Sequence, residues 1–225
     1  MKLLERLPRE TGREYALRVI KNNIIWLELA PGSHVSEKHL ADQMGLSRTP
    51  VREALIELAK GGIVEIYAQR GSVISLIDYS LVEEARFMRS VMETEVIRLV
   101  CEMASPQDIL KLEENIRLQE FYLESRNANR LMELDDEFHK ILFDTAKKSQ
   151  IYMLMQNLTL HFDRVRNMAL TAVKDLKIVE DHRELVELIK SREPEQANAA
   201  MAAHLSRYRI DEKEIRQKYD EKYFK

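Results

Sequence analysis

The stretch HVSEKHLADQMGLSRTPVREALIELAKGGIVEIYAQRGSVISL, residues 34–76, decides the fold of the front of this chain. Two short runs with helical apolar spacing, residues 36–45 and 47–61, each begin at Ser and end at Gly, so we expect two short serine-capped helices joined by a tight turn. Two β-rich runs, residues 63–67 and 72–76, then flank a Gly-containing turn and predict a hairpin. Two such helices followed by a hairpin are the layout of a winged helix-turn-helix.

Glycine separates this front part from the rest of the chain. All 6 Gly residues lie before residue 78, and only two of the 5 Pro residues lie after it. Short elements with tight turns are therefore expected in front, after a first helix at about residues 11–28, and long uninterrupted helices behind. We expect a mostly α protein with a winged helix-turn-helix domain at residues 1–77, including a small β-hairpin wing, and an all-helical bundle at residues 78–225. The predicted bundle helices, with N-caps at Asp78 and Ser105, are 79–104, 106–125, 128–146, 149–170, 174–191 and 194–220.

Composition excludes several classes of protein. The 225 residues are 45% hydrophobic and 32% charged, which supports buried cores and excludes a disordered or collagen-like chain. The single Cys101 excludes a disulfide framework, and no apolar run approaches the ~20 residues of a membrane helix. Charge interrupts the first ten residues before a signal peptide could form, so a cytoplasmic protein is expected.

Charge is distributed unevenly along the chain. Residues 1–77 carry 11 Lys and Arg against 9 Asp and Glu, a net charge of +2. The remainder carries 24 basic and 29 acidic residues, a net charge of −5. A mildly basic front and an acidic back suggest two parts with different partners.

Chemistry for reading DNA lies at the start of the second short helix, LSRTPVREAL at residues 46–55. Arg48 and Arg52 are four residues apart, so both leave one helix face while the apolar side chains leave the other. A planar guanidinium matches guanine edges or phosphates. A solvated charged helix, with these arginines facing water or paired with Glu53 and Glu57, is the alternative. The candidate DNA-binding residues are Lys38, Arg48, Thr49, Arg52, Arg70 and Gly71, the last two at the hairpin tip.

Four potential metal ligands lie in the predicted bundle. Asp135 and His139 are i and i+4 in MELDDEFHKIL, so both leave one face of a helix, while His182 and His204 each lie beside apolar neighbours. Three imidazoles and one carboxylate would suit Zn²⁺, or Ni²⁺, Mn²⁺ or Fe²⁺, if they converge. Spacing alone does not establish convergence, and ordinary surface or core histidines are the alternative.

Residues 11–77 resemble the winged helix-turn-helix of GntR-type bacterial transcription regulators. The resemblance is carried by SRTPVREAL and by the RG-containing wing that follows it. It implies a sequence-specific regulator of transcription and not an enzyme, with no catalytic residues. It also implies that the residues matching Lys38, Arg48, Thr49 and Arg52 contact operator DNA, and that the wing tip, Gln69-Arg70-Gly71, enters the minor groove.

Residues 80 to about 210 resemble the FCD effector domain of the FadR subgroup of these regulators. The matching positions are Asp135, His139, His182 and His204 in the pattern D-x-x-x-H, H, H, and Arg89 with Glu93 in the pattern R-x-x-x-E. The resemblance implies that the first four bind a divalent metal and that Arg89 helps to bind a small organic acid against it. A plain i, i+4 salt bridge with Glu93 is the alternative for Arg89. The small-Gly-Asn turn usual in the family is replaced here by Ala146-Lys147-Lys148-Ser149.

These features predict a homodimeric transcriptional regulator, acting as a repressor, in which each protomer reads half of an inverted repeat in double-stranded DNA. A small carboxylate bound at a metal ion, Zn²⁺ first among the candidates, is expected to relieve repression. Two other classes stay open from the residues alone: a metal-dependent hydrolase, and an architectural DNA binder whose helical part only dimerises. The charged tail at residues 211–225 is expected to be a solvated extension or an arm that reaches a partner chain, and together with Tyr208 it could close or extend the bundle.

Overall fold

A computed structural model describes residues 1–68, 70–125, 127–172, 177–206 and 212–225. The chain is mostly helical with one small antiparallel sheet, which confirms the expected fold class. Its internal contacts divide it into two compact units. The N-terminal unit comprises Met1–Val82, Leu160–Val165 and Tyr219–Lys225, and the bundle unit comprises Glu83–Thr159 and Arg166–Lys218. A single boundary at residue 77 did not anticipate the two later segments of the N-terminal unit.

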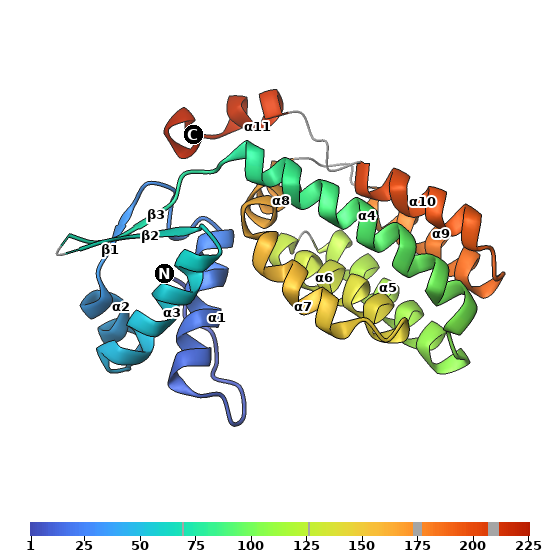
Figure 1. The fold of residues 1–225 in the computed structure, drawn as a ribbon, viewed down its shortest axis with the longest axis horizontal. Helices are drawn as coiled ribbons and strands as arrows, with labels where there is room; N and C mark the ends of the chain where they lie inside the picture. The colour runs from blue at the N-terminus through green and yellow to red at the C-terminus, as the bar shows by residue number, and fades with distance from the viewer. Residues whose placement is uncertain (69, 126, 173–176, 207–211) are drawn as a thin grey trace. The chain divides into compact units, whose positions relative to one another are not determined.

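Three helices and a three-stranded sheet form the winged helix-turn-helix of the N-terminal unit (Figure 1). In chain order they are α1 (Gly12–Ile25), β1 (His34–Val35), α2 (Glu37–Met44), α3 (Arg48–Lys60), β2 (Val64–Tyr67) and β3 (Gly71–Ile74). The strand order is β1-β3-β2, with both pairs antiparallel. Strand β1 was not expected, because two residues are too few to show an alternating pattern.

Local signals set the ends of these helices. Gly45 adopts a left-handed conformation with φ of 65° and ends α2, as expected for a glycine stop. Ser36 and Ser47 hold the N-cap positions of α2 and α3, but within the described structure their side chains make no capping hydrogen bond, so that part of the prediction was wrong. A full capping box forms instead between Thr11 and Glu14 at the start of α1.

Two later stretches of the chain complete the N-terminal unit. Leu160, the first residue of α8 (Leu160–Ala172), is buried in the apolar core formed by α1, α2 and α3. The short 3-10 helix η1 (Glu221–Tyr223) precedes Phe224, which forms a β-bridge with Ile77. The unit is thus assembled from three separate parts of the sequence.

A buried polar cluster, the His161–Arg164 cluster, lies beside the end of β3. Arg164 is fully buried, donates to the carbonyl of Ser75 (2.6 Å) and contacts Nδ1 of His161 (2.7 Å). The backbone N–H of Asp78 also donates to this Nδ1 (3.2 Å), so the ring proton sits on Nε2, which donates to the carbonyl of Gly62 (3.2 Å). Burial and the neighbouring Arg164 lower the pKa of His161 to about 4. His161 is therefore a neutral structural residue.

The bundle unit is all helical. Its elements are α4 (Tyr79–Met103) from Glu83 onward, α5 (Pro106–Glu124), α6 (Ala128–Thr145), α7 (Ser149–Leu158), α8 from Arg166 onward, α9 (Ile178–Lys190), α10 (Pro194–Ser206) and α11 (Glu212–Lys218). One apolar core joins α4, α5, α6, α7, α9 and α10. Ser105 caps α5 through a capping box with Asp108, and the Asp78 carboxylate accepts from the Ser80 N–H at the start of α4, so both expected caps are confirmed.

One expected helix is broken. The range 149–170 is divided at Thr159 into α7 and α8. Thr159 is β-branched, and its hydroxyl donates to the Gln156 carbonyl (3.3 Å), which competes with helical hydrogen bonding. The other ranges match within a few residues where the structure describes them; residues 173–176 and 207–211, with Tyr208, lie outside the described residues.

The turn after α6 keeps a left-handed residue without glycine. Lys147 has φ of 57°, its N–H donates to the Asp144 carbonyl (3.0 Å), and the Lys148 N–H donates to the Phe143 carbonyl (2.7 Å). These two bonds form a Schellman motif, which usually places glycine at the left-handed position. The exposed Lys147 therefore carries backbone strain that glycine would avoid.

Candidate nucleic-acid interface and candidate metal centre

The candidate DNA-binding residues share an exposed face of the N-terminal unit. A groove of about 670 Å³ runs between α2, α3 and the wing. Its lining includes five of the six candidates, namely Lys38, Arg48, Arg52, Arg70 and Gly71. Thr49 is exposed in the first turn of α3. The groove therefore gathers four cationic side chains around the start of one helix, a typical electrostatic footprint for nucleic acid.

The second short helix, α3, presents its two arginines as the spacing predicted. Val51, Ala54, Leu55 and Leu58 are buried on its inner face, while Arg48 and Arg52 are exposed on the other. Arg52 lies 4.0 Å from Glu37 of α2, whereas the alternative placed it in water or beside Glu53 and Glu57. Glu57 is instead paired with Lys60 (3.0 Å) and Arg13 (3.6 Å). A long, exposed ion pair contributes little, so the Arg52 guanidinium can exchange it for DNA.

A glycine with a left-handed conformation lies at the tip of the wing. Gly71 begins β3 with φ of 85°, and a Cβ there would lie 3.4 Å from the carbonyl oxygen of Val35. The left-handed φ favours glycine at this position. Arg70 is exposed beside it, while Gln69 lies outside the described residues.

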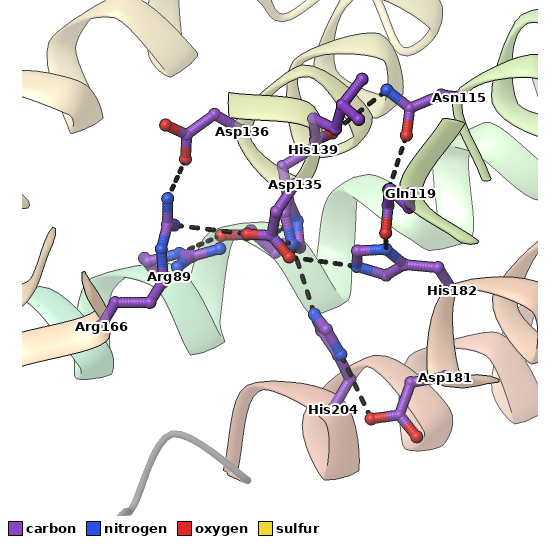
Figure 2. A network of polar contacts seen from close by, with 12 residues as sticks. Arg89, Asn115, Gln119, Asp135, Asp136, His139, Arg166, Asp181, His182 and His204 are labelled. Carbon is purple, nitrogen blue, oxygen red and sulfur yellow. Dashed lines mark hydrogen bonds and ion pairs between the residues drawn. The ribbon is translucent and has the colours of Figure 1, made fainter. Parts of the chain in front are cut away.

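The four candidate metal ligands come together inside the bundle unit (Figure 2). Asp135 and His139 from α6, His182 from α9 and His204 from α10 are all buried, and one potential ligand atom from each lies within 4.8 Å of the others. The Nε2 atoms of His204 and His139 are 3.3 Å apart. Asp135 places one carboxylate oxygen 3.6 Å from Nε2 of His182 and the other 4.0 Å from Nε2 of His139. We call these four residues the Asp–His cluster.

An oxygen holds the outer nitrogen of each imidazole. Nδ1 of His139 faces the Glu93 carboxylate, Nδ1 of His182 lies 2.9 Å from Oε1 of Gln119, and Nδ1 of His204 lies 3.3 Å from Oδ2 of Asp181. Carboxylate and amide oxygens accept, so Nδ1 of His182 and Nδ1 of His204 carry the proton, and we assign His139 the same tautomer from its contact with the Glu93 carboxylate; each Nε2 then presents its lone pair to the centre. Metal-ligating histidines in proteins are oriented in this way.

The Asp–His cluster fits a divalent cation. Potential ligand atoms of the four residues lie within 4.8 Å of one another, and three imidazole lone pairs gathered beside a carboxylate repel one another unless a proton or a metal ion lies between them. Within the described structure, the buried Nε2 of His182 has no hydrogen-bond partner. A proton is disfavoured there, because burial and the neighbouring His204 hold the pKa of His182 well below its usual value. Three nitrogens and one oxygen are a donor set that suits Zn²⁺ and related ions.

Two buried arginines balance the carboxylates around the Asp–His cluster. Nε of Arg89 lies 2.6 Å from Glu93, so the i, i+4 salt bridge named as an alternative is present. Arg166 lies 3.4 Å from Asp135 and also contacts Asp136. Burial alone would raise the pKa of Glu93 and of Asp135, but Arg89 and Arg166 respectively, aided by the imidazoles, hold both pKa values below their usual range. Both carboxylates are therefore ionised at neutral pH.

Sequence reasoning missed the residues that orient the imidazoles. Gln119 and Asn115 occupy core positions on α5 together with Leu112 and Ile116. Two amides on an apolar stripe were the available signal, because buried polar side chains need partners. Asp181 directly precedes His182, yet it orients His204, a relation that only the fold creates.

Four further polar residues, Arg164, Asn167, His34 and His39, lie outside the Asp–His cluster. Arg164 belongs to the His161–Arg164 cluster, while Asn167 is buried on α8. His34 lies in β1, and His39 is exposed on α2. None of these four side chains belongs to the set of potential ligands found among the described residues.

A winged helix-turn-helix with a cationic groove over α3 defines the class: a DNA-binding protein. Residues 14–74 match the family described as bacterial regulatory proteins, gntR family, and residues 84–207 match the FCD domain. The chain belongs to the GntR family of bacterial transcription regulators and carries an FCD domain, as the resemblance indicated. Such regulators bind operator DNA and are not enzymes, which removes the hydrolase alternative.

Individual relatives agree with this assignment. The HTH-type transcriptional repressor RspR of Escherichia coli (strain K12) is 30% identical over 211 residues, covering 93% of this chain and 92% of that protein. The Nta operon transcriptional regulator of Aminobacter aminovorans is 25% identical, covering 79% and 83%. The solved structure of E. coli McbR/YncC has the same fold, with a TM-score of 0.81 at 18% identity over 93% of this chain and 99% of that one.

None of the described helices combines the length and apolar character needed to cross a membrane.

Proposed function

We propose that this GntR-family regulator is a repressor whose binding to operator DNA is controlled by a small organic acid, bound beside a divalent metal ion in the bundle unit. One observation carries the proposal: three buried imidazoles, each with Nδ1 beside an oxygen, and one buried carboxylate bring potential ligand atoms within 4.8 Å of one another. Asp135, His139, His182 and His204 would hold the ion. RspR, a similar protein, is a repressor by name, which supports the sign of the regulation.

The chemistry of the surroundings favours an anionic effector. A divalent ion bound by three nitrogens and one oxygen supplies positive charge and can leave a position open to a carboxylate. Arg89 directs its Nε to Glu93, and a guanidinium has further N–H donors with which it can pair a second carboxylate. Arg89 is therefore the proposed effector-binding residue. The positive charge of the metal ion and of Arg89 would not favour an uncharged alkyl chain or a cation.

The proposed assembly is a homodimer that binds an inverted repeat. Phe87 and Val91 leave one face of α4 with 74% and 51% of their surfaces exposed. Leu154 and Leu158 leave one face of α7 with 69% and 64% exposed. Large apolar side chains exposed in groups are typical of protein interfaces, and a twofold dimer presents two recognition helices to symmetric half-sites.

The test is titration of operator DNA with metal-loaded protein, with and without each member of a panel of small mono-, di- and tricarboxylates. We expect at least one acid to weaken operator binding by about 5- to 150-fold, the usual range of allosteric coupling. The same titration with Arg89→Gln is expected to lose the response. If no acid in the panel changes operator binding, the proposed effector control is wrong.

Metal content separates this proposal from the architectural alternative. Protein purified without added metal is expected to hold about one divalent ion per chain, since the Asp–His cluster is preformed. A bundle that only dimerises has no reason to retain an ion. Metal-free protein that binds operator normally and ignores every acid would favour the architectural alternative.

A further inference from the structure

A buried line of amides leads from the backbone of α6 to the imidazole of His182 (Figure 2). The side-chain amide of Asn115 donates to the Leu134 carbonyl (3.1 Å), and Nε2 of Gln119 donates to Oδ1 of Asn115 (2.6 Å). Oε1 of Gln119 then faces Nδ1 of His182 at 2.9 Å. Asn115, Gln119 and His182 are 4%, 0% and 0% exposed, so bulk solvent does not reach these contacts.

Only one direction of hydrogen bonding is possible along this line. A backbone carbonyl can only accept, so Asn115 must turn its NH₂ group to Leu134 and its oxygen to Gln119. Gln119 must then donate its NH₂ group to that oxygen, which leaves its own oxygen for His182. An amide oxygen accepts, so Nδ1 of His182 must carry the ring proton, and Nε2 must present a lone pair.

We propose that Asn115 and Gln119 form a relay that sets the tautomer of His182, and that both are positioning residues for the metal-binding cluster. This inference rests on the proposed metal site, but the tautomer can be observed without any metal. The Leu134 carbonyl directly precedes Asp135 in the chain, so the relay also ties the backbone beside one proposed ligand to the imidazole of another.

The histidines of this chain show why a relay is needed. Carboxylates hold His139 and His204, and a carboxylate accepts through either oxygen, so it needs no orientation of its own. An amide has a donor end and an acceptor end, so Gln119 selects the correct tautomer only while Asn115 orients it. Burial does not impose this tautomer, because the buried His161 of the N-terminal unit carries its proton on Nε2.

Metal affinity provides the first test. Gln119→Met keeps the size of the side chain but removes the acceptor, and we expect its affinity for Zn²⁺ and Co²⁺, measured by chelator competition, to fall about 10- to 100-fold. Asn115→Leu is expected to produce a smaller fall, because Gln119 stays in place without its orienting partner. Gln107→Met is the matched control, since Gln107 is an exposed residue of the same helix. Unchanged affinity in Gln119→Met would overturn the proposal.

The tautomer provides the second test, and its first reading is made on the wild-type protein. Long-range ¹H–¹⁵N spectra of the metal-free wild-type protein, with His182 assigned by its loss in His182→Ala, are expected to show the Nδ1–H form. Gln119→Met and Asn115→Leu are expected to move His182 toward the Nε2–H form. A wild-type His182 in the Nε2–H form, or a tautomer unmoved by both substitutions, would overturn the relay. Wild-type protein that binds neither ion would instead refute the metal site of the proposed function, while these spectra still decide the relay.

Discussion

The two candidate sites of this regulator are built on opposite physical plans. The arginines over α3 are exposed and gain their direction from the face of a single helix. The Asp–His cluster is at most 2% exposed, is assembled from α6, α9 and α10, and needs further side chains to orient its imidazoles. An exposed group meets a ligand that arrives from solvent, whereas a buried ligand set depends on side chains of several helices to place each of its atoms.

This difference bears on how the effects of substitutions combine. Exposed arginines that contact separate parts of DNA should act nearly independently, because changing one leaves the other in place. Buried ligands that share one ion should behave as a unit, because losing any of them removes most of the reason for the others to converge.

The largest expected effect is the loss of metal from His182→Ala. The variant removes one of three nitrogens, so metal content measured on purified protein should fall from about one ion per chain to near zero. His182→Ala combined with His204→Ala should be no worse than either alone. His161→Gln, which changes a buried histidine of the other unit, should keep its metal. Operator binding without acid should persist in all three, and metal retained by His182→Ala would break the four-ligand site.

Next in size are the arginines of the groove. Arg48→Ala and Arg52→Ala should each weaken operator binding by about 1–3 kcal/mol if they read base edges, and the double variant should show nearly the sum. Fluorescence anisotropy with operator and scrambled duplexes measures both effects. Arg117→Ala, an exposed arginine on α5, is the charge-matched control and should change little. Equal losses on both duplexes would demote these arginines to phosphate contacts.

A smaller effect concerns the buried His161 of the N-terminal unit, whose protonation should change the stability of the protein. Burial and Arg164 lower the pKa of His161 to about 4 from its usual 6.5, with Asp78 opposing the shift and Lys225 adding to it. The unfolded chain therefore binds the extra proton first, and stability is lost as pH falls from 6.5 toward 4. At pH 5 this loss amounts to about 2 kcal/mol. We compare the metal-free wild-type protein with His161→Gln by urea unfolding at pH 7 and pH 5. The free energy of unfolding should fall by about 2 kcal/mol less in His161→Gln than in the wild type. An equal fall in both proteins would contradict the neutral state assigned to His161.

The smallest expected effect is a gain in stability at the turn after α6, away from both candidate sites. Lys147→Gly should raise the free energy of unfolding by about 1 kcal/mol, because glycine adopts the left-handed conformation of this turn without strain. Lys148→Gly, one position further on, should not stabilise. Metal content and operator affinity should stay unchanged, since Lys147 is exposed and belongs to neither site. A gain in stability accompanied by a change in either binding activity would mean that this turn is part of a site.

Much of the fold could be predicted because its signals are local. Glycine stops, helical apolar spacing and the arginine pair of α3 lie within short stretches, and each element formed close to its expected range. Strand β1 and the break at Thr159 could not be predicted in this way. The strand exists only through its partner β3, and Thr159 interrupts an apolar pattern that continues on both sides.

The candidate metal site divides along the same line. Asp135 and His139 could be paired from their spacing, but the distances to His182 and His204 depend on how α9 and α10 pack. Gln119 and Asp181 were out of reach for a further reason. They contact imidazoles 63 and 23 residues away in the chain. Each accepts from the Nδ1 of its imidazole and so leaves the Nε2 of that ring to the metal-binding cluster.

The first residues of α8 and the C-terminal residues are part of the N-terminal unit, which has a practical consequence. A fragment that stops at Ile77 would keep every arginine of the groove but would lack Leu160, Arg164 and Phe224, and so part of its own interior. The DNA reader of this regulator is therefore not a detachable module. Fusing it to another sensor domain would require that domain to supply an apolar side chain in place of Leu160 and a cation for the carbonyls that Arg164 binds, in addition to a linker of the right length.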